Sequence, residues 1–165
     1  MESENRIRKL RRLIEGAFDR ISYPGDNNIS DEYCCEECHQ IANALRGRSW
    51  KDVTFEYVEG HQELNEGFSL LSPGACRYFL PAFLIMTILH YWDLDMVPLS
   101  LTGALCPNQA EPNSQFLDIF EPLTTQQKRA VRLFLEYLLD EYPEEYSKDV
   151  DENVVLALER YWADK

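Results

Sequence analysis

The sequence lacks an apolar run long enough to cross a bilayer. Its longest run, Phe79 to Leu89, falls far short of the ~20 residues that a transmembrane helix needs. No apolar block follows the basic residues Arg6, Arg8 and Lys9, so the N-terminus does not have the pattern of a secretory signal. These absences predict a soluble cytoplasmic protein that has no membrane partner.

The motifs of the common enzyme classes are also missing. The chain has only three histidines, no serine in a nucleophile-elbow pattern, no phosphate-cradling glycine motif and no His-Glu-x-x-His. His90 follows an apolar segment and is interpreted as a hydrogen-bonded core or helix-end residue. We therefore predict no catalytic residue, and an enzyme is the minority hypothesis.

Positive charge is scarce, because 16 Lys and Arg residues face 29 Asp and Glu, for a formal net charge of -13. A nucleic-acid partner is not expected, since a phosphate backbone requires a basic stripe. The acids concentrate in the last thirty residues, and such a surface attracts and orients a basic protein. The alternative is a solvated face that only keeps the protein soluble. The carboxylates predicted to bind a partner are Asp140, Glu141, Glu144, Glu145, Asp149, Asp151 and Glu152.

Five cysteines cannot all pair within one chain, and without an export signal they are expected to stay reduced. The segment Cys34-Cys35-Glu36-Glu37-Cys38-His39 contains one C-x-x-C pair. A structural zinc site needs four nitrogen or sulfur ligands, so zinc on Cys35, Cys38 and His39 would require Cys76 or His61 to join them. A redox pair is disfavoured because no βαβ pattern surrounds the motif. The favoured interpretation is that Cys34 and Cys38 pack as small hydrophobes on a helix face, and no other cofactor is predicted.

What the sequence does contain is a large apolar fraction. With 165 residues, 45% of them hydrophobic and 12% aromatic, the chain suits one domain with a sizeable core. Ser72 and Pro73 have the pattern of a helix start, and the residues that follow are apolar on every face. A helix of this kind is buried, so we predict a buried central helix over residues 73–92.

Apolar residues recur at three- and four-residue spacing elsewhere in the chain, which predicts amphipathic helices around the central one. A basic extension, residues 1–13, precedes and continues the first of them. Residues 94–113 lose the periodicity and contain several prolines, so a long irregular loop is expected there. The other predicted helices cover residues 7–21, 32–46 with Asp31 as cap and Gly47 past the end, 52–65, 115–120, 124–142 with a Thr124/Gln127 capping box, and 151–163. The predicted fold is an all-α, single-domain bundle of about six or seven helices.

Several sequence blocks occur in an order and spacing that resemble a bacterial family of unknown function. The similarity covers about residues 14–162 and implies a compact bacterial domain without an assigned activity. The blocks are Tyr23-Pro24-Gly25, Cys35-Glu36-Glu37-Cys38, residues 47–50, Leu71-Ser72-Pro73 with residues 77–82, residues 134–138 and residues 157–162.

Three functions are compatible with these patterns. The leading hypothesis is a non-catalytic acidic domain that binds a basic protein, such as an immunity protein against a toxin or a regulatory inhibitor. The second is a small metal- or ligand-binding domain that uses the Cys35/Cys38 region. The third, an enzyme with an acidic active site, would need carboxylates that converge in a pocket.

Overall fold

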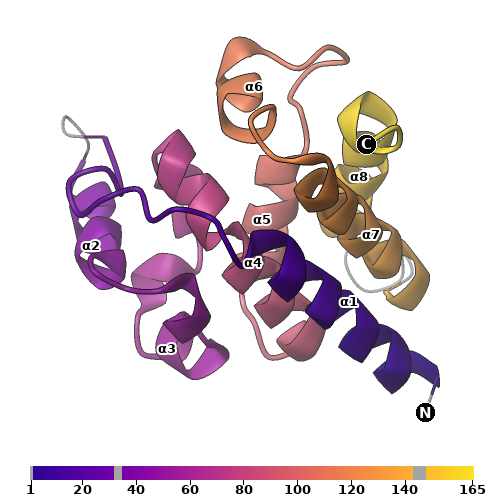
Figure 1. Cartoon of the computed structure of the whole chain (residues 1–165), viewed down its shortest axis with the longest axis horizontal. Helices are drawn as coiled ribbons and strands as arrows, with labels where there is room; N and C mark the ends of the chain where they lie inside the picture. Colours follow the sequence, from indigo (N-terminus) through magenta and orange to yellow (C-terminus); the bar gives the residue numbers. More distant parts are fainter. Residues whose placement is uncertain (1, 32–34, 143–147) are drawn as a thin grey trace. The chain divides into compact units, whose positions relative to one another are not determined.

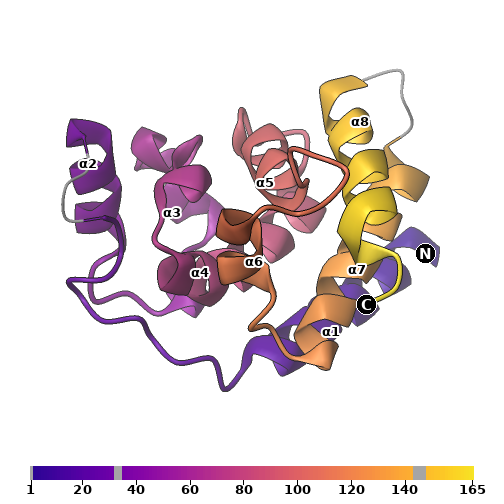
Figure 2. The ribbon, with the colours of Figure 1, turned by 90° about the horizontal axis from the view of Figure 1, so that it is seen from above.

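The structure is a computed structural model that describes residues 2–31, 35–142 and 148–165. Within these ranges the backbone forms eight α-helices and no β-strand (Figures 1 and 2), which confirms the predicted all-α class. None of the helices in these ranges has the length and apolarity needed to span a bilayer.

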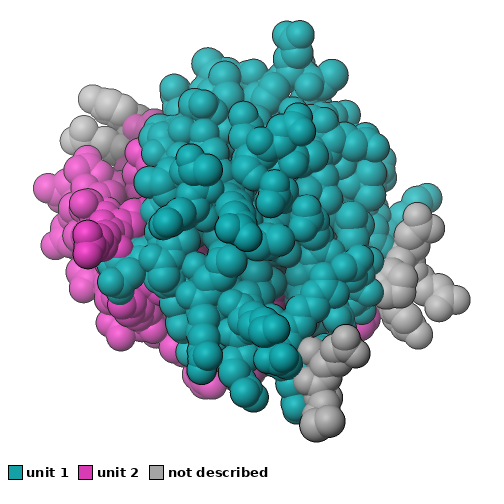
Figure 3. All heavy atoms as spheres, turned by 45° about the vertical axis from the view of Figure 1, so that its right-hand side comes forward, with its two compact units in different colours: residues 1–19, 102–165 teal, residues 20–101 magenta. Residues whose placement is uncertain are grey.

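The chain divides into two compact units, which Figure 3 shows in separate colours. One unit consists of residues 20–101, and the other of residues 1–19 and 102–165. The single domain expected from the sequence stays a prediction.

The unit of residues 20–101 is built around its longest helix. In α4 (Pro73–His90) the Ser72 hydroxyl accepts a hydrogen bond from the Ala75 N–H, and proline occupies the first helical position. Twelve of the 18 residues of α4 are buried, because hardly any polar side chain interrupts its apolar surface. The buried central helix is therefore confirmed, and it ends at His90 instead of residue 92. The unit also contains α2 (Glu36–Leu45), α3 (Phe55–Glu59) and the 3-10 helices Trp50–Asp52, Gln62–Leu64 and Gly67–Leu70.

The structure corrects two predicted helices in this unit. Helix α2 begins at Glu36 after an N-cap at Cys35, so Asp31 is not its cap; the positive φ of 69° at Gly47 beyond its end agrees with the prediction. The single helix predicted over 52–65 is wrong, because three short helices occupy residues 50–64. Thr54 starts α3 by accepting a hydrogen bond from the Tyr57 N–H, and Gly60 ends it.

The other unit pairs the first helix with a long helix from the second half of the chain. Helix α1 (Glu2–Phe18) lies against α7 (Thr125–Glu141), as Figure 1 shows. The capping box of Thr124 and Gln127 is present at the start of α7, as predicted. Helices α6 (Ser114–Phe120) and α8 (Lys148–Ala157) and the π-helical segment Leu158–Trp162 complete the unit.

The prediction of a long irregular loop over residues 94–113 is wrong for residues 97–105, because α5 (Val97–Leu105) lies within it. Pro98 is tolerated at the second position of this helix, where its missing N–H has no intrahelical partner. Buried residues of α5 recur at four-residue spacing, at Val97, Leu101 and Leu105. The residues between them are also apolar or small, so the sequence shows no helical alternation of apolar and polar residues. Helix α5 raises the count in the described residues to eight, one more than expected.

Candidate functional site

The predicted zinc ligands lie around the start of α2. Cys35 is an exposed free thiol, His39 is exposed, and Cys38 is buried. The Sγ atoms of Cys35 and Cys38 are 3.5 Å apart. Cys38 is disulfide-bonded, which corrects the expectation that all five cysteines stay reduced. A sulfur in a disulfide is not a thiolate ligand, and Cys34 lies outside the described residues.

The residues that were expected to complete a zinc site lie elsewhere. Cys76 is buried in α4, where desolvation raises its pKa to about 12 and its thiol donates to the carbonyls of Phe68 and Leu71. His61 stacks on the Tyr57 ring, with 4.1 Å between ring centroids. In the described part of the chain, no three His, Cys, Asp or Glu side chains are grouped so that they could hold a metal ion. The zinc hypothesis therefore has no support from the geometry of these residues.

The structure separates the carboxylates that were predicted to bind a partner. Asp140 and Glu141 form ion pairs with Arg6 of α1, at 2.5 Å and 3.5 Å, and Ser3 donates to Glu141. Asp151 is buried, with 7% of its surface exposed. Glu144 and Glu145 lie outside the described residues. Asp149 and Glu152 are exposed in the first turns of α8, and Asp140 is exposed although it pairs with Arg6.

A different exposed feature lies at the C-terminal end of α4. Trp92 is 64% exposed and Leu89 is 40% exposed. The helical backbone continues through Tyr91, so these two side chains, three residues apart, lie on one face. Asp93 and Asp95, both exposed, follow directly. We call Leu89, Trp92, Asp93 and Asp95 the tryptophan patch.

A further carboxylate and a histidine adjoin this patch. His90 stacks on Phe55 of α3 at 4.4 Å, and its Nδ1 is 3.7 Å from Asp93 Oδ2. The pKa of Glu56 is lowered by hydrogen bonds from its own backbone N–H and from Thr54, with a smaller contribution from His90. Glu56 is thus ionised at neutral pH, and the C-terminal end of the α4 helix dipole adds negative potential. The patch therefore combines a large exposed aromatic surface with negative charge.

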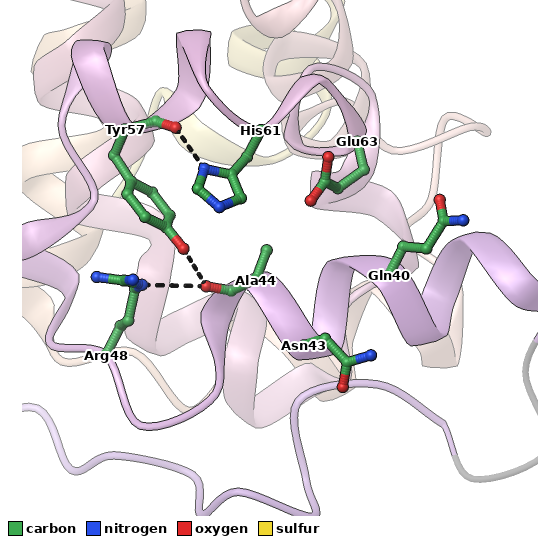
Figure 4. A pocket seen from close by; sticks show the side chains of 7 residues that line it. All are labelled: Gln40, Asn43, Ala44, Arg48, Tyr57, His61 and Glu63. Carbon is green, nitrogen blue, oxygen red and sulfur yellow. Dashed lines mark hydrogen bonds between the residues drawn. The ribbon is translucent and has the colours of Figure 1, made fainter.

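An open pocket of about 450 Å³ lies in the same unit (Figure 4). Its walls come from α2 and the turn that follows it, from α3, and from the 3-10 helix Gln62–Leu64 with the residue before it. The lining residues are Gln40, Asn43, Ala44, Arg48, Tyr57, His61 and Glu63.

Contacts around Tyr57 fix one side of this pocket. The Tyr57 hydroxyl donates a 2.5 Å hydrogen bond to the Ala44 carbonyl, to which Arg48 Nε also donates at 3.2 Å. The Arg48 guanidinium carbon lies 4.0 Å from the centre of the Tyr57 ring. His61 Nδ1 is 2.8 Å from the Tyr57 carbonyl oxygen; because a carbonyl only accepts, Nδ1 carries the proton and Nε2 is the acceptor of the neutral ring.

Sequence reasoning missed both features. The tryptophan patch had a signal, since Tyr91-Trp92-Asp93-Leu94-Asp95 places an aromatic pair among acids directly after the apolar helix. The pocket had none, because its residues belong to no known motif and only the fold brings their elements together.

No curated protein and no solved structure matches the chain. The family model that does match covers residues 7–165 and agrees with the resemblance noted in the sequence. The chain belongs to the Family of unknown function (DUF6714).

Proposed function

We propose that this chain is a non-catalytic protein-binding domain of the bacterial cytoplasm, and that its acidic surface binds a basic protein as an immunity protein or inhibitor does. The observation that carries this proposal is the exposed Trp92 among exposed acidic side chains at the end of α4. Tryptophan is enriched among the residues that dominate the free energy of protein–protein binding.

The charge around the tryptophan patch specifies the partner. Residues 20–101 contain 12 acidic and 5 basic side chains, so the unit that carries Trp92 is itself strongly acidic. Asp93, Asp95 and Glu56 would steer a cationic surface toward the patch, and burial of the indole would hold it there. We therefore place the partner-binding surface at the tryptophan patch, and not at the α8 carboxylates predicted from sequence.

The test begins with capture of proteins on the immobilised chain at low salt, after which each captured protein is identified and purified. Calorimetry then measures its affinity for the wild type and for Trp92→Ala. We expect a basic partner, an affinity that falls as salt rises, and a loss of at least ~10-fold in Trp92→Ala. Val155→Ala is the matched control, because Val155 is also apolar and 40% exposed but lies on α8; its affinity should equal that of the wild type.

Two double variants separate the acidic surfaces. Asp93→Asn with Asp95→Asn should weaken binding and flatten its salt dependence, whereas Asp149→Asn with Glu152→Gln should change neither. The reverse result would overturn the placement at the tryptophan patch. The proposal as a whole fails if low salt captures no protein, or if the captured partner is acidic and binds independently of salt.

A further inference from the structure

We infer that the pocket lined by Arg48, Tyr57, His61 and Glu63 binds a free α-amino acid, with the ligand carboxylate on Arg48 and its ammonium group on Glu63. This inference is independent of the proposed protein partner, since Trp92 does not line the pocket. The volume of about 450 Å³ falls in the range of small-molecule sites.

Arg48 is held in an orientation suited to a carboxylate. Its Nε donates to the Ala44 carbonyl, and its guanidinium plane lies over the Tyr57 ring at 4.0 Å. Among the described residues, neither terminal nitrogen of Arg48 has a hydrogen-bond or ion-pair partner. A guanidinium that is already fixed by stacking loses little side-chain entropy on binding, and its remaining donors match the two oxygens of a carboxylate.

Glu63 supplies the opposite charge. Figure 4 shows Arg48 and Glu63 on opposite sides of Ala44, with the Glu63 carboxylate directed toward α2. Glu63 is only partly exposed, and no cation of the described residues forms an ion pair with it. A simple anion would be repelled by Glu63 and a simple cation by Arg48, whereas a ligand that carries both charges satisfies both residues.

The neutral residues that line the pocket beside these two charges favour an amino acid over a larger zwitterion. His61 Nε2 accepts a hydrogen bond in the neutral ring, because Nδ1 donates to the Tyr57 carbonyl. Gln40 lines the pocket on the far side of Glu63 from Arg48 (Figure 4). Ala44, which lies between Arg48 and Glu63 (Figure 4), has a small side chain that leaves room for the Cα substituents of the ligand. The site thus offers separate groups to the carboxylate, the ammonium and a small polar side chain.

Calorimetry with the full chain tests the assignment, with the twenty standard amino acids as probes. For the amino acid that binds most tightly, its methyl ester removes the carboxylate charge and its N-acetyl derivative removes the ammonium charge. We expect each derivative to bind at least ~10-fold more weakly than the parent, the usual effect of losing one charged hydrogen-bonded contact. If no amino acid binds at millimolar concentration, or if both derivatives bind as well as the parent, the inference is wrong.

Variants then assign each charge to its residue. Arg48→Gln should weaken binding of the parent but not of the methyl ester, and Glu63→Gln should weaken binding of the parent but not of the N-acetyl derivative. Arg20→Gln and Glu59→Gln, exposed charges of the same unit outside the pocket, are the controls and should bind like the wild type.

If Arg48→Gln does not fold, Arg48→Lys keeps the charge but loses the planar fork, and it should still bind more weakly than the wild type. Unchanged binding in the folded Arg48 variant would overturn the assignment. Trp92→Ala should retain amino-acid binding, which separates this result from the test of the protein partner.

Discussion

The Tyr161 hydroxyl donates a 2.5 Å hydrogen bond to the Glu121 carboxylate, across 40 positions of sequence. Lys128 Nζ lies 3.2 Å from the same Glu121 oxygen. The hydrogen bond from Tyr161, followed by that from Lys128, lowers the pKa of Glu121. On the tyrosine, burial first and then the bond to Glu121 raise the pKa. The ionised Glu121 carboxylate thus links the segment Leu158–Trp162 to the C-terminal end of α6 through this hydrogen bond.

Tyr161→Phe should raise the pKa of Glu121 and lower the free energy of unfolding by about 0.5–1 kcal/mol at neutral pH, a small value because the carboxylate is exposed. Because folding lowers the pKa of Glu121, its ionised carboxylate stabilises the fold at pH values above the ordinary carboxyl pKa of 4.5. This stabilisation is lost as the pH falls through the pKa of the folded state. Denaturation of the two proteins from neutral to acidic pH should therefore show a difference that vanishes in acid. Glu159→Gln, a change at an exposed acid on the same segment, should show no such difference. A difference that persists in acid would contradict the role given to Glu121.

Gly67→Ala should destabilise the protein, because a Cβ at this position would lie 2.9 Å from Ile41 Cδ1 and 3.0 Å from Cγ1. Overpacking of this kind costs about 1–3 kcal/mol. Ile41→Val removes Cδ1, so the double variant should recover part of the loss, with a coupling of at least ~0.5 kcal/mol in urea denaturation. Gly16→Ala is the control: its Cβ would meet no atom within 4 Å, and inside α1 it should stabilise by about 0.5–1 kcal/mol. Additive effects of the Gly67 and Ile41 changes would show that the two residues are not in contact.

Trp162→Phe should lower the free energy of unfolding by about 2–4 kcal/mol. The indole is fully buried and donates a 2.8 Å hydrogen bond to the Leu105 carbonyl. A phenylalanine side chain has no N–H, so the buried Leu105 carbonyl would lose this hydrogen bond. The ring also packs edge-on against Phe120, at a centroid distance of 5.5 Å. Urea denaturation should show a lower midpoint at an unchanged m-value. In contrast, Trp92→Phe at the exposed patch should change the stability by less than about 0.5 kcal/mol.

The free thiols should differ sharply in reactivity. Cys35 is exposed, whereas Cys76 is 2% exposed and its pKa is raised to about 12 by burial. With iodoacetamide at about pH 8, peptide mass spectrometry should find Cys35 alkylated in the folded protein and Cys76 only after urea unfolds it. Rapid alkylation of Cys76 without urea would show that α4 opens in the native state.

The raised pKa of Cys76 also predicts a loss of stability in alkali. The neutral thiol stabilises the fold fully below its ordinary pKa of 9.0, and this contribution is lost as the pH rises toward about 12. In Cys76→Ala this part of the alkaline loss should be absent, although the variant starts from a lower stability because of the cavity it creates. If the two proteins lose the same stability between pH 9 and pH 12, the raised pKa of Cys76 is contradicted.

The sequence by itself determined the helical class, the buried central helix and the helix starts at Ser72 and Thr124. These features depend on local chemistry: a cap needs a hydroxyl at one position, and a buried helix needs apolar residues on all its faces. Local signals were less reliable where the contrast in hydropathy was weak, as in α5, where the residues between the buried ones are apolar or small.

Only the tertiary structure decided which charges and polar groups are available to a partner or ligand. Arg6 pairs with Asp140 from 134 positions away, and Asp151 is buried, so these two carboxylates are not both exposed and unpaired as the sequence pattern suggested. The same holds for Arg48, Tyr57 and Glu63, which share one pocket although they lie on separate elements. The exposure of a side chain depends on contacts between segments that are distant in the chain, and neither composition nor periodicity encodes those contacts.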